Sequence, residues 1–285
     1  MQSIEDIILG NDQRGVAALR PYLPTDYCER TAQYVLSNPG TTLIATGFYI
    51  SRARAPETDG PPGALAIGRA LESLGRRVVY VSDLYTVPIL RAFVKSGTEV
   101  IDFPIADDDA SSQFASELLS RLDPSLLISI ERCGLTKNGT YLNMRGVDIS
   151  PQTARLDHLF LQHPRTIGIG DGGNEIGMGN LARNIPQVAT LPSNPAITGA
   201  THLIISSTSN WGGYGLVAAL SRLVGRNLLP SLEEEAELIG RMVDLGAVDG
   251  VVGASQYSVD SMSLEEHGQA LSRLHDLLAQ EGISA

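Results

Sequence analysis

The feature that most constrains the fold is a regular alternation of short β-branched runs with longer segments of helical periodicity. Strands that alternate with helices along a chain are typical of a parallel sheet covered by helices. Six runs have the length and composition of buried strands, at residues 43–46, 78–81, 99–103, 126–130, 166–169 and 203–206. We therefore predict an α/β fold, with a doubly wound, mostly parallel sheet of about six strands and helices on both of its faces.

Each expected strand is followed by a segment with the 3.6-residue period of a helix. These helices are expected at residues 63–74, 87–96, 112–122 and 154–162, in a short stretch directly after Glu175, and at 215–224. Two later segments, 231–245 and 263–280, both begin with Ser-Leu-Glu-Glu, a helix start in which the serine is the cap and a glutamate follows three residues later. We expect these two helices to pack on a face of the sheet.

Two amphipathic stretches, 4–19 and 26–36, precede the first strand, with breaks expected at Asn11 and in the proline-containing segment 21–24. We assign residues 1–40 to a helical N-terminal extension and residues 41–285 to an α/β domain that carries the ligand site. The extension either caps an edge of the sheet or contributes to the interface of a homo-oligomer, and both alternatives stay open.

The charge and the cysteine content exclude several classes of function. A formal net charge of -11 and a pI near 4.9 argue against a nucleic-acid partner, because binding to phosphates depends on clustered Lys and Arg. Only Cys28 and Cys133 are present, so neither a disulfide framework nor a zinc knuckle can form. With no signal peptide and no run of 18 apolar residues, we expect a cytoplasmic protein that does not span a membrane.

Acidic residues follow four of the six expected strands, at the edge where doubly wound sheets bind their ligands. They are Glu57 and Asp59 after the first strand, Asp83 after the second, Glu131 after the fourth, and Asp171 and Glu175 after the fifth. Any single one of them is equally well explained as a loop or helix-capping residue, and for Asp83 capping is the better explanation. Together they indicate an acidic site that a cation, a proton or a cationic substrate must neutralise.

A divalent metal is the simplest neutraliser of such a cluster. The five histidines are scattered along the chain, and ligands that offer only oxygen favour Mg or Mn over Zn. We predict that Glu57, Asp59 and Asp171 hold this metal. Glu57 and Asp59 lie in the segment ETDGPPGA, whose prolines and glycines predict a stiff loop before a helix.

The segment GDGGNEIGMGN (170–180) resembles a dinucleotide-binding motif only formally. The glycines at 168, 170 and 173 have the right spacing, but they follow the fifth strand and not the first. Asp171 would also oppose a pyrophosphate, and no further acid occurs between Glu175 and Glu233. We therefore interpret Asp171, Asn174 and Glu175 as ligand or proton-transfer residues on a glycine-rich turn.

Two further loops are expected to close the site. Residues 131–146 form a long connection that supplies cations, among them Arg145, whose planar fork suits a substrate carboxylate or phosphate. Residues 207–215 offer hydroxyl, amide and backbone N–H groups at a helix start, which is a natural anion site or simply a cap. The residues predicted to bind substrate are Arg132, Asn143, Asn174, Ser209 and Asn210.

The segments ETDGPPGA, ERCG with the downstream NMRG and DIS, and GDGGNEIGMGN resemble the D-glutamate cyclase C-terminal domain family, over about residues 47–211. That family comprises the C-terminal domain of the mitochondrial cyclase and bacterial proteins made of this domain alone. The resemblance implies an α/β fold and a lyase that dehydrates D-glutamate to 5-oxo-D-proline. On this hypothesis Glu131 or Glu175 accepts a proton, Arg145 holds a carboxylate, and the metal polarises the other one. A metal-dependent phosphatase or other hydrolase and a non-catalytic module for a small anionic ligand are the alternatives.

Overall fold

The computed structural model describes residues 2–283, which are built around a six-stranded sheet. Its strands are β1 (Thr42–Thr46), β4 (Val78–Ser82), β5 (Glu99–Asp102), β6 (Leu126–Ile130), β7 (Thr166–Gly170) and β8 (His202–Ile205). All neighbouring pairs are parallel, and the order across the sheet is β5-β4-β1-β6-β7-β8. The predicted parallel sheet is therefore confirmed. In a doubly wound sheet, ligands bind at the carboxyl ends of the strands, at the point where the strand order reverses. Here that point lies between β1 and β6.

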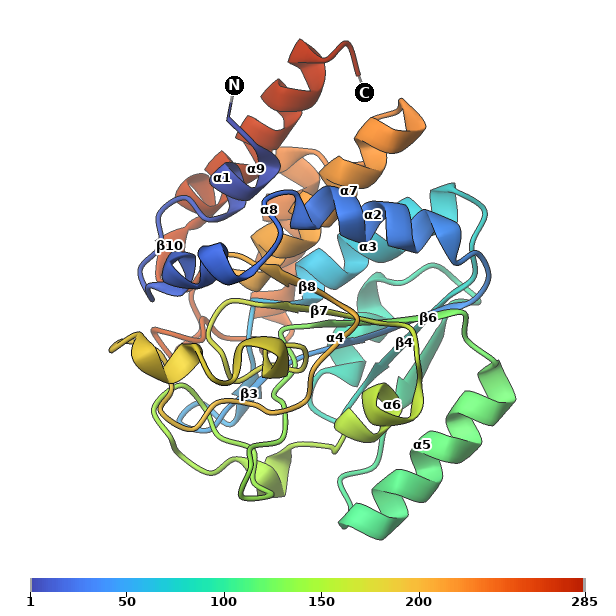
Figure 1. Cartoon of the computed structure of the whole chain (residues 1–285), viewed down its shortest axis with the longest axis vertical. Helices are drawn as coiled ribbons and strands as arrows, with labels where there is room; N and C mark the ends of the chain where they lie inside the picture. The colour runs from blue at the N-terminus through green and yellow to red at the C-terminus, as the bar shows by residue number, and fades with distance from the viewer. Residues whose placement is uncertain (1, 284–285) are drawn as a thin grey trace.

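Helices cover both faces of the sheet (Figure 1). One face carries α2 (Tyr27–Ser37), α3 (Pro61–Ser73) and α7 (Ser209–Val224), and the other carries α5 (Asp108–Leu122) and α6 (Asp157–Gln162). The predicted helix α9 (Leu264–Gln280) packs mainly against α7 and not on the sheet itself. Successive residues of a strand point to opposite faces, so Ile44 of β1 packs in the larger core whereas Leu43 packs in the smaller one. The doubly wound arrangement of layers follows from this alternation.

The N-terminal segment packs in the same core as the sheet. Its elements are α1 (Ile4–Ile8) and the 3₁₀ helix η1 (Val16–Tyr22), and the buried residues Ile4, Ile8 and Leu19 belong to the larger core. The predicted break at Asn11 is confirmed, since this residue has a φ of 55°. The backbone N–H of Ser207, just after β8, donates to the carbonyl of Ile8 at 2.9 Å. This contact places the turn after α1 at the carboxyl end of the sheet.

The remaining elements are short or peripheral. They are α4 (Val87–Phe93), α8 (Leu232–Asp244), the 3₁₀ turns η2 (Ser150–Gln152), η3 (Gly179–Leu181) and η4 (Ile185–Gln187), and the hairpins β2 (Tyr49–Ile50) with β3 (Ala55–Pro56) and β9 (Ser258–Val259) with β10 (Met262–Ser263). Both predicted Ser-Leu-Glu-Glu starts are confirmed, because Ser231 and Ser263 cap α8 and α9. Within residues 2–283, none of the helices combines the length and the apolar character that crossing a membrane requires.

Two of the predicted elements differ from the structure. No α-helix follows Glu175 directly, and η3 and η4 take its place, because the Glu175 carboxylate binds the backbone of its own turn. The helix predicted at 215–224 begins six residues earlier, at Ser209, because a carboxylate from another loop caps its first turn. The two-residue strands of the hairpins are too short to give a periodic pattern, and the sequence did not predict them.

Candidate functional site

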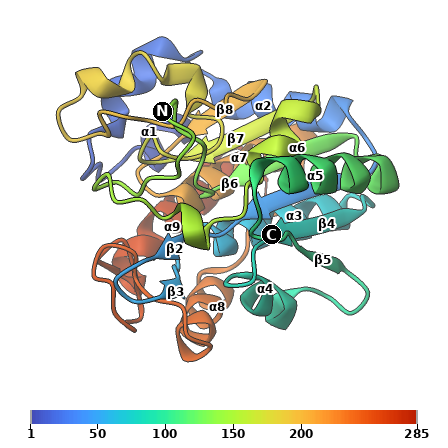
Figure 2. The same cartoon turned by 90° about the horizontal axis from the view of Figure 1, so that it is seen from below.

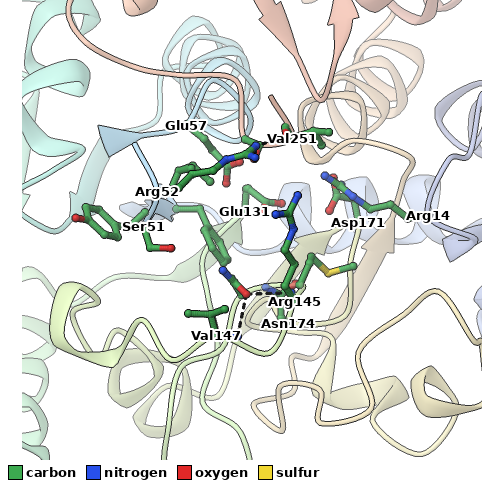
Figure 3. A pocket seen from close by; sticks show the side chains of 16 residues that line it. Arg14, Ser51, Arg52, Glu57, Glu131, Arg145, Val147, Asp171, Asn174 and Val251 are labelled. Atoms are coloured by element: carbon green, nitrogen blue, oxygen red, sulfur yellow. Dashed lines mark hydrogen bonds and ion pairs between the residues drawn. The ribbon is translucent and has the colours of Figure 1, made fainter. Parts of the chain in front are cut away.

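A cavity of about 300 Å³ opens at the carboxyl end of the sheet (Figure 3). Its polar lining comes from five separate parts of the chain and consists of Arg14, Ser51, Arg52, Glu57, Glu131, Asn143, Arg145, Asp171 and Asn174. Phe48, Ile50 and Met144 are among its apolar lining. Three carboxyl groups and three guanidinium groups therefore share one small cavity, which suits a ligand that carries both signs of charge.

Glu131 lies at the centre of this site, directly after β6. It has a φ of 45°, a left-handed conformation that is uncommon for a residue with a side chain and that occurs often at functional sites. A Cβ on Gly60 would lie 2.5 Å from the Cβ of Glu131, so only glycine allows the two loops to approach this closely. The hydroxyl of Ser209 donates to Glu131 Oε2 at 2.5 Å. Burial, together with the nearby Glu175, Glu57 and Asp59, raises the pKa of Glu131 well above its usual range.

Asp59 binds the first turn of α7. Its two carboxylate oxygens accept the backbone N–H groups of Ser209 at 2.9 Å and Asn210 at 2.8 Å. The Asn210 side chain accepts in turn the N–H groups of Gly60 and Gly63, both at 2.9 Å. A negative charge is stabilised at a helix N-terminus, so the expected anion site is filled by a carboxylate of the protein itself.

Glu175 shapes the turn that presents Asp171. Its carboxylate accepts the backbone N–H groups of Gly172 and Gly173, both at 2.7 Å, and that of Asp171 at 3.2 Å. Glu175 is fully buried and is absent from the cavity lining, whereas Asp171 reaches it. The two predicted acids of this loop therefore lie in different environments. Burial, with the nearby Glu131, Asp260 and Asp59, raises the pKa of Asp171 although Arg14 opposes the shift.

Arg14 enters the site from the N-terminal segment and lies beside Asp171 (Figure 3). It forms ion pairs with Asp171 and, at 2.6 Å, with Asp260. Asp260 lies in the two-residue turn between β9 and β10. Burial favours a neutral guanidinium, but Asp171 and Asp260 outweigh this effect and raise the pKa of Arg14. Burial likewise raises the pKa of Asp260, to about 6.

Two groups of three carboxylates, Asp59–Asp171–Asp260 and Glu131–Asp171–Glu175, have oxygens within 4.8 Å of one another. Among residues 2–283, Glu57 belongs to neither group. Its buried Oε1 has no hydrogen-bond partner, and its Oε2 would lie 2.0 Å from a Cβ on Gly250. Burial, Asp260 and Asp59 raise the pKa of Glu57. Of the predicted metal ligands, Asp59 and Asp171 therefore converge on a third acid, Asp260, and not on Glu57.

The mouth of the cavity is formed by two loops. In one, the Asn143 side chain accepts the backbone N–H groups of Arg145 at 2.9 Å and Val147 at 3.0 Å, which forms the turn that carries the exposed Arg145. In the other, Arg52 at the tip of the β2–β3 hairpin donates to the carbonyl of Val251. Figure 2 shows this hairpin on the side of the molecule that carries α8 and α9. Arg52 and Arg145 thus place two cations at the entrance.

Arg132, predicted to bind substrate, points away from the cavity. Its guanidinium pairs with Asp83 at 2.6 Å and donates to the carbonyls of Gly47 and Ala154, both at 2.9 Å. These contacts join the loops that follow β1, β4 and β6. Asn174 does line the cavity, where its buried Oδ1 has no partner and its amide nitrogen donates to the carbonyl of Leu142 at 3.1 Å.

Comparison with known proteins identifies the family of the chain. The family described as D-glutamate cyclase-like, C-terminal, matches residues 4–275. The chain belongs to this family. Mitochondrial D-glutamate cyclase of Homo sapiens is 29% identical to it over 292 residues, a match that covers 86% of this chain and 47% of that protein. The chain therefore spans about half the length of the curated relative it matches.

One match among solved structures is a point variant of actinorhodin polyketide ketoreductase with NADPH. It is 15% identical, with a TM-score of 0.28, and the match covers 83% of this chain and 90% of that one. This similarity is too low to add to the description of the site.

The sequence patterns did not indicate three charged residues of this site, Arg14, Arg52 and Asp260. Arg14 was placed within an expected helix, and only the turn built on Asp12 brings it to the sheet edge. Asp260 gives a weak signal, because Asp249 and Asp260 each follow a valine and precede a small residue, as acids at the ends of short strands do. Arg52 gives none, since an exposed arginine in a loop is ordinary.

Proposed function

We propose that the protein is a lyase that closes a lactam from an acidic amino acid, converting D-glutamate to 5-oxo-D-proline and water. The observation that carries this proposal is the pairing, in one small cavity, of a buried proton-exchanging carboxyl at Glu131 with arginines at the mouth. Membership of the D-glutamate cyclase-like family supports the choice of substrate. The similarity to human mitochondrial D-glutamate cyclase supports it further.

The reaction requires proton transfer at two atoms of the substrate. The amino nitrogen forms a bond to the side-chain carboxyl carbon, and one C–O bond of that carboxyl group breaks. The ammonium group loses two protons, and both leave with the departing oxygen as water, so no oxidant or further reactant is needed. A general acid and base whose pKa lies nearer to neutrality suits these transfers.

Glu131 is the better candidate for this role than Glu175. Glu131 lines the cavity and has a raised pKa, so it exchanges protons nearer to neutral pH. The Glu175 carboxylate is engaged by three backbone N–H groups and lies outside the lining. Glu57, also a lining residue with a raised pKa, is positioned to protonate the departing oxygen.

Arginines at the mouth supply the binding energy for the carboxylate that does not react. Arg145 is held at the entrance by the turn on Asn143, and Arg52 lies at the tip of the β2–β3 hairpin. An arginine fork binds both oxygens of a carboxylate and so fixes its orientation. Since the amine and the acid belong to one molecule, this positioning lowers much of the barrier to ring closure.

A divalent metal, Mg or Mn, is a separate proposal. The three acids Asp59, Asp171 and Asp260 have the oxygen ligands that such an ion prefers. However, Arg14 already contacts two of them, and a metal would have to displace it. We therefore assign no step of the reaction to a metal.

The proposal is tested by incubating the purified full chain, in separate reactions, with D-glutamate, L-glutamate, 5-oxo-D-proline and a generic phosphoester, with and without Mn²⁺, and following the products by chromatography. We expect 5-oxo-D-proline to form from D-glutamate, with a loss of activity in Glu131→Gln. Hydrolysis of a generic phosphoester without lactam formation would instead favour the hydrolase alternative.

The two buried, unpaired cysteines, Cys28 and Cys133, agree with a proposed cytoplasmic location, where thiols stay reduced.

A further inference from the structure

Three buried acids of the site, Asp59, Asp171 and Asp260, lie close together, and two of them share one cationic neighbour. Their oxygens approach within 4.8 Å of one another, a cluster that repels itself strongly when all three are charged. Arg14 pairs with Asp171 through Nη1 and with Asp260 through Nη2, so the two arms of one guanidinium group join two of the three acids. Asp59 is neutralised separately by the first turn of α7.

The backbone around Arg14 is fixed so that the side chain points into this cluster. The Asp12 carboxylate accepts the N–H groups of Arg14 at 3.1 Å and Gly15 at 2.7 Å, which forms a tight turn before η1. The hydroxyl of Thr190 donates to the Arg14 carbonyl at 2.5 Å. Val16, two residues later, is fully buried in the larger core. Arg14 is therefore presented by a rigid turn and is not a mobile surface arginine.

Arg14 also contributes to the walls of two cavities. It lines the main cavity, and it lines a second one of about 210 Å³ together with Asn11, Gln13, Ser207 and Asp260. Buried oxygens of Ser207 and Asp260 have no hydrogen-bond partner. A cation that replaced Arg14 would thus meet open space and further oxygen ligands on the far side.

We propose that Arg14 is the resident cation of the Asp59–Asp171–Asp260 cluster, a positioning residue that occupies the place of a divalent metal ion and fixes Asp171 at the cavity wall. Two consequences follow from this arrangement. Loss of the guanidinium group should convert the cluster into a true metal site, and lysine should replace arginine only partly, since one ammonium group lacks the fork that spans two carboxylates. Neither consequence depends on the substrate assigned above.

The test is a calorimetric titration of MnCl₂ into the full chain as wild type, Arg14→Met, Arg14→Lys and Arg20→Met. Methionine is uncharged and replaces the aliphatic part of the arginine side chain. Arg20→Met is the matched control, because Arg20 also pairs with an acid of the N-terminal segment, Asp6, but lies outside both cavities. We expect Arg14→Met to bind Mn²⁺ at least about tenfold more tightly than wild type, a difference of roughly 1.4 kcal/mol. The Mn²⁺ affinity of Arg14→Lys should fall between those of wild type and Arg14→Met, and that of Arg20→Met should equal wild type.

Equal Mn²⁺ affinity in wild type and Arg14→Met would overturn the proposal, and so would equal affinities in Arg14→Met and Arg14→Lys. If Arg14→Met does not fold alone, MnCl₂ should restore its folding, because an ion bound only by the folded state stabilises that state. Failure of Mn²⁺ to restore it would count against the proposal. In Arg14→Met with Asp260→Asn, the gained affinity should disappear. All these readouts measure binding and folding, so a negative D-glutamate assay would refute the proposed function without touching this result.

Discussion

Asp59 and Asn210 each hold the backbone of the other's segment: the Asp59 carboxylate accepts the N–H of Asn210 at 2.8 Å, and the Asn210 side chain accepts the N–H of Gly60 at 2.9 Å. This reciprocal pair joins the loop after β1 to the start of α7, two segments about 150 residues apart. It also fixes the position of Glu131, because Ser209 of the same helix turn donates a hydrogen bond to the Glu131 carboxylate.

Asp59→Ala and Asn210→Ala should each lower the free energy of unfolding by about 1–3 kcal/mol, because each leaves buried backbone donors without a partner. The double variant should lose less than the sum of the two, since both residues stabilise one junction. Urea denaturation measures all three. Asp107→Ala, which removes an exposed cap of α5, is the control and should cost about 1 kcal/mol. Additive losses would contradict the idea of a single junction.

Glu131→Gln should lower kcat for lactam formation at least about 100-fold, since an amide cannot exchange the proton. It should leave stability near neutral pH unchanged or higher, because burial already disfavours the charged carboxylate. Glu175→Gln should instead lower the free energy of unfolding, by about 1–3 kcal/mol, because the Glu175 carboxylate oxygens accept three backbone N–H groups. If both variants changed activity and stability alike, the two acids would not have separate roles.

Stability should fall as the pH rises through the mildly acidic range. A free aspartate has a pKa of 3.8, and burial raises the pKa of Asp260 to about 6 in the folded protein. The folded state therefore binds this proton more tightly than the unfolded state, and its stability is lost between about pH 4 and pH 6. The raised pKa values of Glu57, Glu131 and Asp171 act in the same direction at higher pH. Asp260→Asn should flatten the curve by roughly 3 kcal/mol at most. Thermal unfolding from pH 4 to 8 measures this, and a wild-type curve that rises with pH would be inconsistent with it.

Arg145→Gln should raise KM for D-glutamate at least about tenfold and change kcat less, because the residue binds a carboxylate that does not react. Lys137→Gln is the matched control: Lys137 is an exposed cation of the same loop that does not line the cavity, and its loss should change neither constant. Steady-state kinetics of both variants with D-glutamate measure these effects. An equal effect of both substitutions would show that only the overall charge of the loop matters.

Gly250→Ala should reduce activity strongly, because the added Cβ would lie 2.0 Å from Glu57 Oε2 and would displace that carboxyl from the cavity wall. Gly240→Ala tests whether any added methyl group in this region is harmful. Gly240 lies within α8, where an added Cβ would lie 3.9 Å from the Tyr257 ring, and alanine there should stabilise the helix by about 0.5–1 kcal/mol. Full activity in Gly250→Ala would show that the reaction does not require the Glu57 carboxyl group in this position.

The sheet could be predicted from the sequence because each of its strands carries a short local signal. The runs 43–46 and 126–130 are apolar on both faces, which only a covered central strand tolerates, and these strands lie at the reversal point of the sheet. The acids that follow them, Asp59 and Glu131, were accordingly placed at the right edge. The start of α7 was missed because its cap, Asp59, lies far away in sequence, and a local pattern contains no such partner.

The site itself could be predicted only in part. Glu57, Glu131, Asp171, Asn143, Arg145 and Asn174 all line the cavity, as expected from their place after strands and in the long loop. Arg132 could not be distinguished from Arg145 by sequence, because both are cations of one loop and only the position of Asp83 draws Arg132 away. Arg14 was missed for a similar reason, since its partners lie 157 and 246 residues further along the chain.

That last separation has a consequence for how the protein is made. The Arg14–Asp260 pair joins the turn before η1 to a hairpin near the other end of the chain. During synthesis, the acids of the site must therefore wait until residue 260 has left the ribosome before their arrangement is complete. At typical elongation rates of roughly 5–20 residues per second, Arg14 spends on the order of ten seconds or more without this partner. Until then this arginine and the acids of the site stay in water, and they can be buried together only once both ends of the chain are available.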